Sequence, residues 1–479
     1  MLTTLSLLFT CCLAAEPGDL TPNPLVLRRA EHQSDFPALA VDSQGTPWVA
    51  YVEWDGKQDR LCLAQQAGDA LTQVRTLGKP GIIHQPALAA AKDNALVVVW
   101  SQVDERNLMV LKAQRLRKDQ LEGEEVTLAA SDNGGNVFAR AAADRTGRVW
   151  VVWQSMRGGL GDVFCRTLDP RTNQWSPEIQ VTSDPSGQWE PCIAFDGADG
   201  AWVVYDSSSG NEFNICANRV SLDGKVSATK TLIQTDRYEG RASAVGTPDG
   251  RGIWLTCERG NQQWGLDMRA HGAQQGLNGR KDSVLAYWDL ASDKVEEMPS
   301  LDPLLADLPG PPTSGAAPRG NNAQAKAKAE QRAKARANQG KNTGAVAAVN
   351  LPQVTLDAAG RPWVTVRYFK NYCWRVALAR FDPASKQWTE PFALAQSAYA
   401  QDRRTGSALS AAGELWLCWP SDLRNSKLHR TVGFSLAKVA TDDASPLISV
   451  AAAKPRPAFG AYINPTTPER PRDERHTWT

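Results

Sequence analysis

Seven copies of one short pattern predict an all-β fold, a seven-bladed β-propeller of four-stranded antiparallel blades. Each copy holds a short apolar strand, an Asp/Gly turn and a second strand that usually opens with Trp, as in PALAVDSQGTPWVAY (37–51). The corresponding residues of the second strands are Trp48, Val97, Trp150, Trp202, Trp254, Trp363 and Trp416. These residues are 49 to 53 positions apart, with one step of 109. A repeat of this length is typical of propellers.

The residues of each copy explain why it should form strands. The first strand is a short run of small and β-branched residues bounded by turn residues, which favours a buried strand over a helix. In the turn, Asp hydrogen-bonds its own backbone and Gly supplies a positive φ. In the second strand, Trp150 and Trp153 are three positions apart, so they face opposite sides of the sheet. Large rings on both faces suit a blade packed between two others.

Two more strands are expected in each copy, and the chain ends are expected to close the ring. A fourth strand pairs with the third through a hairpin, most visibly in 168–182 and 381–395. The early strand PLVLRR (24–29) is expected to pair into the last blade. Eight blades remain an alternative if the long step contains a degenerate copy. The clearest third strands are GDVFCRTLD (161–169), EFNICANRVS (212–221) and SVLAYWDL (283–290).

The domain organisation follows from composition. Residues 1–15 have the apolar core and the small-residue exit of a signal peptide, which predicts an exported protein in the periplasm, at the cell surface or outside the cell. Cys11 leaves a lipid anchor open as an alternative. The propeller is expected over 22–450, followed by a Pro/Arg-rich tail or linker at 451–479. No other stretch is apolar and long enough to cross a bilayer.

One low-complexity insertion interrupts the predicted propeller at 309–344. It carries seven Lys/Arg against a single Glu and almost no large apolar residue. Such a segment cannot bury enough surface to order itself, so we expect it to be disordered. The whole chain has a formal net charge of +1, so nothing in its overall field indicates a specific nucleic-acid partner. We expect a monomer.

The cysteines and histidines favour neither a disulfide framework nor a metal site. Seven cysteines follow the leader, an odd number without compact spacing. Cys62, Cys165 and Cys216 occupy matching places in their third strands, which favours small buried thiols between blades. The five histidines are scattered, and no HExxH, GxSxG or phosphate-binding loop is present. No metal ligand and no cofactor is predicted.

The phrase xAVDxxGxxWVAY resembles the strand and turn signature of NHL-type and related secreted bacterial propellers, over roughly residues 35 to 440. The turn is also similar to the Asp-box of sialidase-like (BNR-type) propellers, although it joins the first and second strands here instead of the third and fourth. These resemblances imply the architecture. The tail resembles the junction that precedes PHP-like metal-dependent domains in large exported proteins, which would make the propeller a recognition or packing arm. No residue of that metal site is present.

One face of the predicted propeller gathers the loops that join strands two to three and four to one, opposite the Asp/Gly turns. Binding residues concentrate on loops held by a rigid scaffold, so we expect the site at this mouth. The second-to-third loops are 53–60, 101–107, 154–162, 206–212, 258–281, 367–372 and 420–426. The ligand-binding residues expected there are Asp35, His84, Trp189, Glu190, Asp206, Glu239, Arg241, Glu258, Arg367 and Tyr368.

The sequence predicts a binding or interaction module that recognises a glycan or a protein without catalysis. The alternative is a sialidase-like glycoside hydrolase at the same mouth, because glycoside chemistry needs two carboxylates and groups that hold the sugar. A sialidase-like site implies three arginines, a Tyr/Glu pair and an Asp. The first-blade arginine of that family is missing, since SDFPALA (34–40) holds none. The candidates for catalysis are Tyr238, Glu239, Arg241, Arg367, Tyr368 and Arg404.

Overall fold

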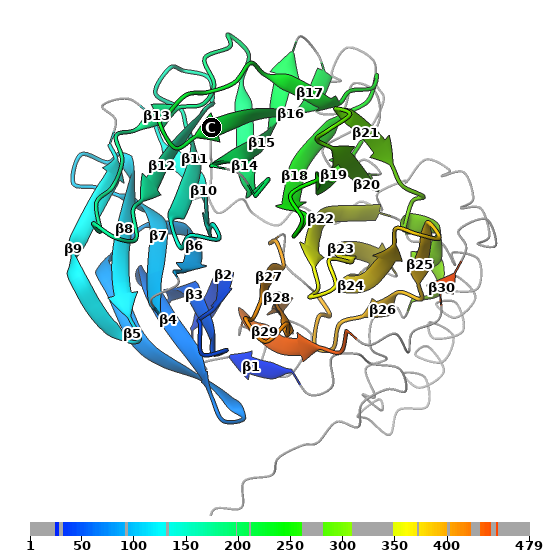
Figure 1. Ribbon diagram of the computed structural model, residues 1–479. Helices are drawn as coiled ribbons and strands as arrows, with labels where there is room; N and C mark the ends of the chain where they lie inside the picture. The colour runs from blue at the N-terminus through cyan, green and yellow to red at the C-terminus, as the bar shows by residue number, and fades with distance from the viewer. Residues whose placement is uncertain are drawn as a thin grey trace, which may run out of the picture.

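In the computed structural model, the described residues are all-β apart from one short 3-10 helix, and Figure 1 shows the sheets arranged as blades in a ring. The structure describes residues 24–27, 32–91, 94–130, 134–197, 199–209, 212–260, 281–308, 348–370, 373–399, 403–422, 432–441 and 447–448. The predicted signal peptide, the insertion at 309–344, the tail at 451–479 and most of the loop 258–281 lie outside these residues.

The described strands form seven antiparallel sheets, which confirms the seven-bladed propeller and leaves no eighth blade among these residues. Blade 1 contains β2 (Gln33–Val41), β3 (Pro47–Trp54), β4 (Asp59–Ala67) and β5 (Ala70–Gly81). Blade 2 contains β6 (Ile83–Ala90), β7 (Ala95–Val103), β8 (Met109–Arg117) and β9 (Gln120–Ala129). Blade 3 contains β10 (Asn136–Ala143), β11 (Val149–Ser155), β12 (Asp162–Leu168) and β13 (Ile179–Gln180).

The remaining blades repeat the order from the ring axis outward. Blade 4 contains β14 (Gln188–Ala194), β15 (Gly200–Ser209), β16 (Glu212–Ser221) and β17 (Lys230–Ile233). Blade 5 contains β18 (Glu239–Gly246), β19 (Gly252–Arg259), β20 (Asp282–Asp289) and β21 (Lys294–Glu297), followed by the 3-10 helix η2 (Asp302–Asp307). Blade 6 contains β22 (Ala348–Leu356), β23 (Pro362–Lys370), β24 (Cys373–Asp382), β25 (Gln387–Thr389), β26 (Phe392–Ala393) and β30 (Leu447–Ile448).

The seventh blade is closed by the N-terminal strand, as the sequence predicts. It consists of β27 (Gly406–Leu409), β28 (Leu415–Asp422), β29 (Val432–Val439) and, at its outer edge, β1 (Leu25–Leu27). β1 runs antiparallel to β29, with Leu25 opposite Leu436 and Leu27 opposite Phe434. Leu27 is buried against the same cluster as Phe434. Figure 1 shows β1 in blue beside β29, so the start of the chain closes the ring.

The hydrophobic core lies between the blades. Trp153 packs into a cluster with Val97 and Val99 of blade 2, whereas Trp150 packs with Val203 and Tyr205 of blade 4. Both indoles are fully buried. The two faces of β11 therefore bury their large rings against different neighbours, as the two-residue period predicts.

In three of the turns, the recurring Asp and Trp are joined by a hydrogen bond. In blade 1, Asp42 Oδ1 accepts from the backbone N–H of Gln44 and Thr46, both at 2.9 Å. Its Oδ2 accepts from Trp48 Nε1 at 2.9 Å. The carboxylate thus orders the turn and fixes the indole that opens the next strand. The same indole bond joins Trp150 to Asp144 and Trp363 to Asp357, both at 3.0 Å.

Cys62, Cys165 and Cys216 pack in clusters between blades, as predicted. All seven cysteines that the structure describes are buried thiols. Burial alone raises the pKa of the Cys165 thiol to about 12, so this group is uncharged at neutral pH. In the described part of the chain, no helix has the length and apolar character that spanning a membrane requires.

Candidate functional site: the mouth of the propeller

Six of the seven innermost strands contain a bulge at the same place. In β2, Asp35 pairs with Val52 and Ala38 pairs with Ala50, so two residues oppose one. The first bulged residue has a positive φ in each of the six blades, which turns its side chain out of the regular pleat. These residues are Phe36, Gln85, Phe138, Glu190, Arg241 and Leu351. In blade 7, Arg404 holds the equivalent place, two residues before the paired Gly406.

All seven of these residues line one cavity of about 780 Å³ at the ring axis. We call it the mouth cavity. Every blade contributes to it, because six inner strands each bring one bulged residue to the axis and blade 7 brings Arg404. A concave site on a rigid scaffold, built from apolar groups and a few polar ones, is the common form of a ligand pocket.

One side of the mouth cavity is aromatic. The His84 ring lies between Phe36, with ring centroids 5.0 Å apart, and Phe138, at 5.8 Å. The Arg403 guanidinium covers the Phe36 ring, 3.9 Å from its centroid. It also pairs with Asp35 at 3.0 Å. Burial lowers the pKa of His84 to about 4, helped by the nearby arginines. At neutral pH this arc is therefore uncharged apart from the Arg403–Asp35 pair.

The other side of the mouth cavity is charged. Arg404 donates to Glu190 Oε2 at 2.7 Å and to the Ala242 carbonyl at 3.0 Å. Arg241 Nε lies 3.4 Å from Glu190 Oε1. Burial works to raise the pKa of Glu190, but Arg404 and Arg241 outweigh it and hold the pKa below its usual value. Glu190 is therefore ionised and shared by two guanidiniums.

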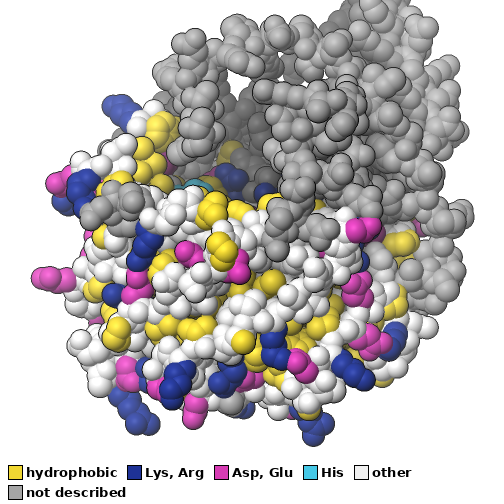
Figure 2. Space-filling view, turned by 90° about the horizontal axis from the view of Figure 1, so that it is seen from above, with side chains coloured by type: hydrophobic (Ala, Val, Ile, Leu, Met, Phe, Trp, Pro, Cys, Tyr) yellow, Lys and Arg dark blue, Asp and Glu magenta, His cyan; other side chains and the backbone are white. Residues whose placement is uncertain are grey.

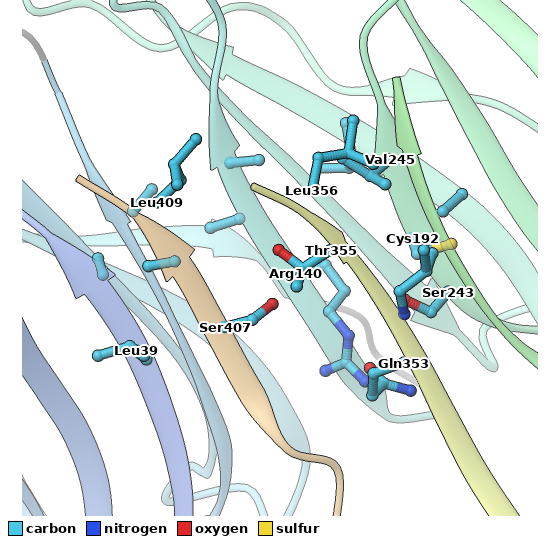
Figure 3. Close-up of a pocket in the computed structure, with 18 of the residues that line it drawn as sticks. Leu39, Arg140, Cys192, Ser243, Val245, Gln353, Thr355, Leu356, Ser407 and Leu409 are labelled. Atoms are coloured by element: carbon cyan, nitrogen blue, oxygen red, sulfur yellow. The ribbon is translucent and has the colours of Figure 1, made fainter. Parts of the chain in front are cut away.

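Arg140 lies deeper along the axis, two residues beyond the bulge of blade 3. Burial, followed by the charge of Arg404, lowers the pKa of Arg140 to about 10, so it remains a cation at neutral pH. It also lines a second cavity of about 560 Å³, which continues the axis toward Asp357 and the Asp/Gly turns. Figure 3 shows Arg140 and Gln353 in this channel cavity, with Ser243, Thr355 and Ser407 around it.

Four polar residues line both cavities: Arg140, Gln353, Arg404 and Ser407. We call this set the junction. Its members come from blades 3, 6 and 7, so it is assembled only when the ring is closed. On the described outer surface, basic and acidic side chains are interspersed, and neither sign dominates the side seen in Figure 2.

The structure places four of the predicted site residues on the mouth cavity: His84, Glu190, Arg241 and Arg404. Asp35 is not among the residues that line this cavity, and it forms an ion pair with the lining residue Arg403. Trp189 does not line the cavity, and its ring stacks on Phe213 with centroids 5.2 Å apart.

Two other predicted carboxylates, Asp206 and Glu258, lie behind the mouth. Asp206 is buried and accepts from the backbone N–H of Arg241 at 2.6 Å, which supports the bulge of blade 5. Burial and Glu190 raise the pKa of Asp206 to about 7. Glu258 supports the bulge of blade 6 in the same way, accepting from Leu351 N–H at 2.7 Å, and it pairs with Lys281. These side chains hold the shape of the cavity.

Glu239 and Tyr238 are buried as well. Glu239 Oε1 accepts from Arg259 Nε at 2.8 Å and from Thr235 Oγ1 at 2.5 Å. Tyr238 is 7% exposed, and burial and the nearby Asp206 raise the pKa of its hydroxyl. Neither residue is among those that line the two cavities described above.

Arg367 and Tyr368 lie in β23 and not in a loop. The sequence places them in a second-to-third loop at 367–372, but the ladder continues, with Arg367 opposite Val376 and Tyr368 opposite Arg375. Arg367 donates to Asn350 Oδ1 at 3.0 Å. Tyr368 is fully buried between blades. Residues 367–369 therefore alternate between the two faces of a strand, and both faces are packed.

Sequence reasoning missed Phe36, Phe138, Arg140 and Arg403. A signal for Arg140 was present, because ARAAAD carries Arg where PALAVD and PALAAA carry Ala. Among the described residues, no group of His, Cys, Asp and Glu side chains is arranged to hold a metal ion.

Comparisons with known proteins support the architecture. No family model and no curated protein matches the chain. Among solved structures, a polysaccharide lyase described as an ulvan lyase matches with a TM-score of 0.51 at 9% identity, covering 90% of this chain and 100% of that one. The same lyase bound to -[GlcA(1-4)Rha3S]- matches with a TM-score of 0.51 at 8% identity and the same coverage.

An α-L-arabinanase from Penicillium chrysogenum complexed with arabinobiose has a TM-score of 0.44 at 11% identity, covering 75% of this chain and 99% of that chain. Structural neighbours of this propeller therefore include glycan-active proteins. The narrower resemblance to NHL-type or sialidase-like families stays a prediction.

Proposed function

We propose that this chain is an exported glycan-binding module that holds its ligand in the mouth cavity and does not cleave it. The observation that carries the proposal is the composition of this one cavity, to which all seven blades contribute. Aromatic rings lie on one side and guanidinium groups on the other. Carbohydrates present apolar ring faces and polar hydroxyl edges, and such a cavity can satisfy both.

The positions of the carboxylates favour binding over hydrolysis. Glycoside hydrolysis by the usual routes needs two carboxyl groups on either side of the bond, roughly 5–10 Å apart. Glu190 is the single carboxylate among the described residues of the mouth cavity, and Arg404 and Arg241 engage it. Asp206, Glu239 and Glu258 are buried and bound to backbone or basic groups. This arrangement provides recognition without an acid/base pair.

The comparison with solved structures agrees with a carbohydrate ligand. The ulvan lyase, which shares the fold, is bound to -[GlcA(1-4)Rha3S]- in one of its structures. The sialidase-like hydrolase remains the alternative function. For that function, the candidate catalytic residues Tyr238 and Glu239 would have to become accessible to the substrate, because both are buried.

A glycan array probed with the purified protein tests the proposal, with fluorogenic glycosides and sialosides assayed in parallel. We expect binding to a restricted set of glycans, lost in Phe138→Ala, without turnover. Thr172→Ala, in the turn between β12 and β13 on the opposite face, is a matched surface control. Turnover that Glu239→Gln abolishes would establish the hydrolase instead, and silence in both assays would point to a protein ligand.

A further inference from the structure

The mouth cavity has more positive than negative charge. Its described lining includes the four arginines Arg140, Arg241, Arg403 and Arg404 but one carboxylate, Glu190. Asp35 lies behind the lining and balances Arg403. Glu190 is shared between Arg404 and Arg241. Cationic groups gathered in a poorly solvated site favour an anionic ligand, because charge pairing offsets the cost of desolvation.

Two of these four arginines, Arg140 and Arg404, lie at the junction. Arg140 and Arg404 approach it from blades 3 and 7, close enough that the charge of Arg404 lowers the pKa of Arg140. Gln353 and Ser407 line the same place and supply an amide and a hydroxyl. Figure 3 shows Arg140 and Gln353 reaching toward the same part of the channel. A planar guanidinium beside neutral donors is suited to the oxygens of a carboxylate or sulfate group.

The enclosure of the cavity limits which part of a glycan can reach the junction. The mouth cavity is lined by inner-strand residues of every blade, so its described part is centred on the ring axis. At its floor, Arg140 and Arg404 stand where the mouth cavity meets the channel cavity. The last residue of a glycan can enter such a cavity. An internal residue fits an axial cavity less well, because the chain would have to leave it on both sides.

We propose that the ligand ends in an acidic sugar whose carboxylate or sulfate group binds at the junction, to Arg140 and Arg404 with Gln353 and Ser407. This inference rests on the proposed glycan-binding function. Glu190 is then an internal carboxylate that competes with the ligand for Arg404 and tunes its affinity.

Ligand-observed NMR titration with four probes tests the proposal: D-glucuronate, its methyl ester, glucose 6-sulfate and glucose. Glucuronate and its ester differ by the charge and by one methyl group. Charge-assisted hydrogen bonds to a buried guanidinium correspond to about tenfold or more in affinity, so we expect at least one acidic probe to bind that much more tightly than its neutral counterpart. The preference of glucuronate over glucose 6-sulfate decides between carboxylate and sulfate.

The variant Arg140→Met should remove this preference and leave the binding of the neutral probes intact. Arg171→Met is the matched control, because Arg171 is exposed in a turn on the opposite face, and it should bind as the wild type does. Glu190→Gln should raise the affinity for the acidic probes several-fold and change the neutral ones little. This second variant keeps the test valid if Arg140→Met does not fold.

Equal binding of glucuronate and its ester, and of the sulfate and glucose, would overturn the inference and leave glycan binding in place. Failure of all four probes together with a silent glycan array would overturn both proposals. An oligosaccharide with glucuronate at its end should bind more tightly than one whose only glucuronate is internal. Equal affinity for these two would overturn the terminal position of the acidic sugar.

Discussion

Arg404 and Glu190 join the seventh blade to the fourth at the ring axis, with a hydrogen bond of 2.7 Å between the guanidinium and Oε2 of the carboxylate. The two residues are 214 positions apart in the sequence. Glu190 occupies the bulge position of β14, and Arg404 holds the equivalent place just before β27. The pair therefore combines two functions, because it connects distant blades and presents charge to the mouth cavity.

Breaking this pair should destabilise the protein. Arg404→Met removes one partner from a largely buried ion pair, with side chains 12% and 17% exposed, and we expect a loss on the order of 1–3 kcal/mol in the free energy of unfolding. The double variant Arg404→Met/Glu190→Gln should lose less than the sum of the single losses. Urea unfolding of the four proteins in the cycle measures this. Additive losses would show that the two side chains do not interact.

The pH dependence of stability should contain a contribution from His84. Burial lowers the pKa of His84 from 6.5 to about 4. Between these values the unfolded chain binds the proton and the folded one does not, so His84 makes the protein less stable as pH falls from 6.5 toward 4. In His84→Phe, urea midpoints should fall less steeply over this range. An unchanged slope would mean that the imidazole is not excluded from water.

Asp206 should act in the opposite direction. Its pKa is raised from 3.8 to about 7 by burial and by Glu190, so the folded state holds the proton between these values. This contribution to stability is complete below pH 3.8 and disappears as pH rises through 7. Asp206→Asn keeps an acceptor for the backbone of Arg241 and removes the titration. Its stability relative to the wild type should rise between pH 4 and 7, and a constant difference would contradict the raised pKa.

The ring closure predicts a sharp contrast between neighbouring residues of β1. Leu27 is 5% exposed and packs with Phe434, whereas Val26 is 37% exposed. Leu27→Ala should cost about 2–4 kcal/mol in the free energy of unfolding. Val26→Ala should cost under about 1 kcal/mol, because its side chain is already in water. Similar losses for both variants would mean that β1 does not hold the last blade.

Much of the fold could be predicted from the repeats. The spacing of Asp and Trp, as in Asp42 and Trp48, marks a turn and the indole that its carboxylate holds. The alternation of Trp150 and Trp153 indicates burial on both faces, which the clusters confirm. These features are local, since each depends on residues within a few positions of one another.

The residues of the site were harder to predict, because the bulge interrupts the regular alternation of side chains along the inner strand. Phe36 and Leu351 have a positive φ although neither is glycine, so the residue type at the bulge does not predict this backbone conformation. A signal was nevertheless present in Pro37, which follows the bulged residue, since a central strand tolerates proline chiefly at bulges. Equivalent prolines follow in three other copies, at Pro86, Pro191 and Pro352.

The prediction of loops from charged residues was wrong in one place. Arg367 was predicted in a charged loop at 367–372. It lies in a strand instead, with its guanidinium 4.4 Å from the Trp374 ring centroid. Arg140 and Arg404 line the same two cavities because the closed ring places blades 3 and 7 around one axis. Contacts of this range are set by the whole ring, and no local sequence pattern encodes them.

The central claim is that the mouth cavity binds a glycan and leaves it intact. Isothermal titration with an oligosaccharide that the array identifies, followed by mass spectrometry of the recovered sugar, tests it most directly. We expect one binding site per chain, loss of the heat of binding in Phe138→Ala and recovery of the uncleaved oligosaccharide. Recovery of shortened products, or full binding by Phe138→Ala, would contradict it.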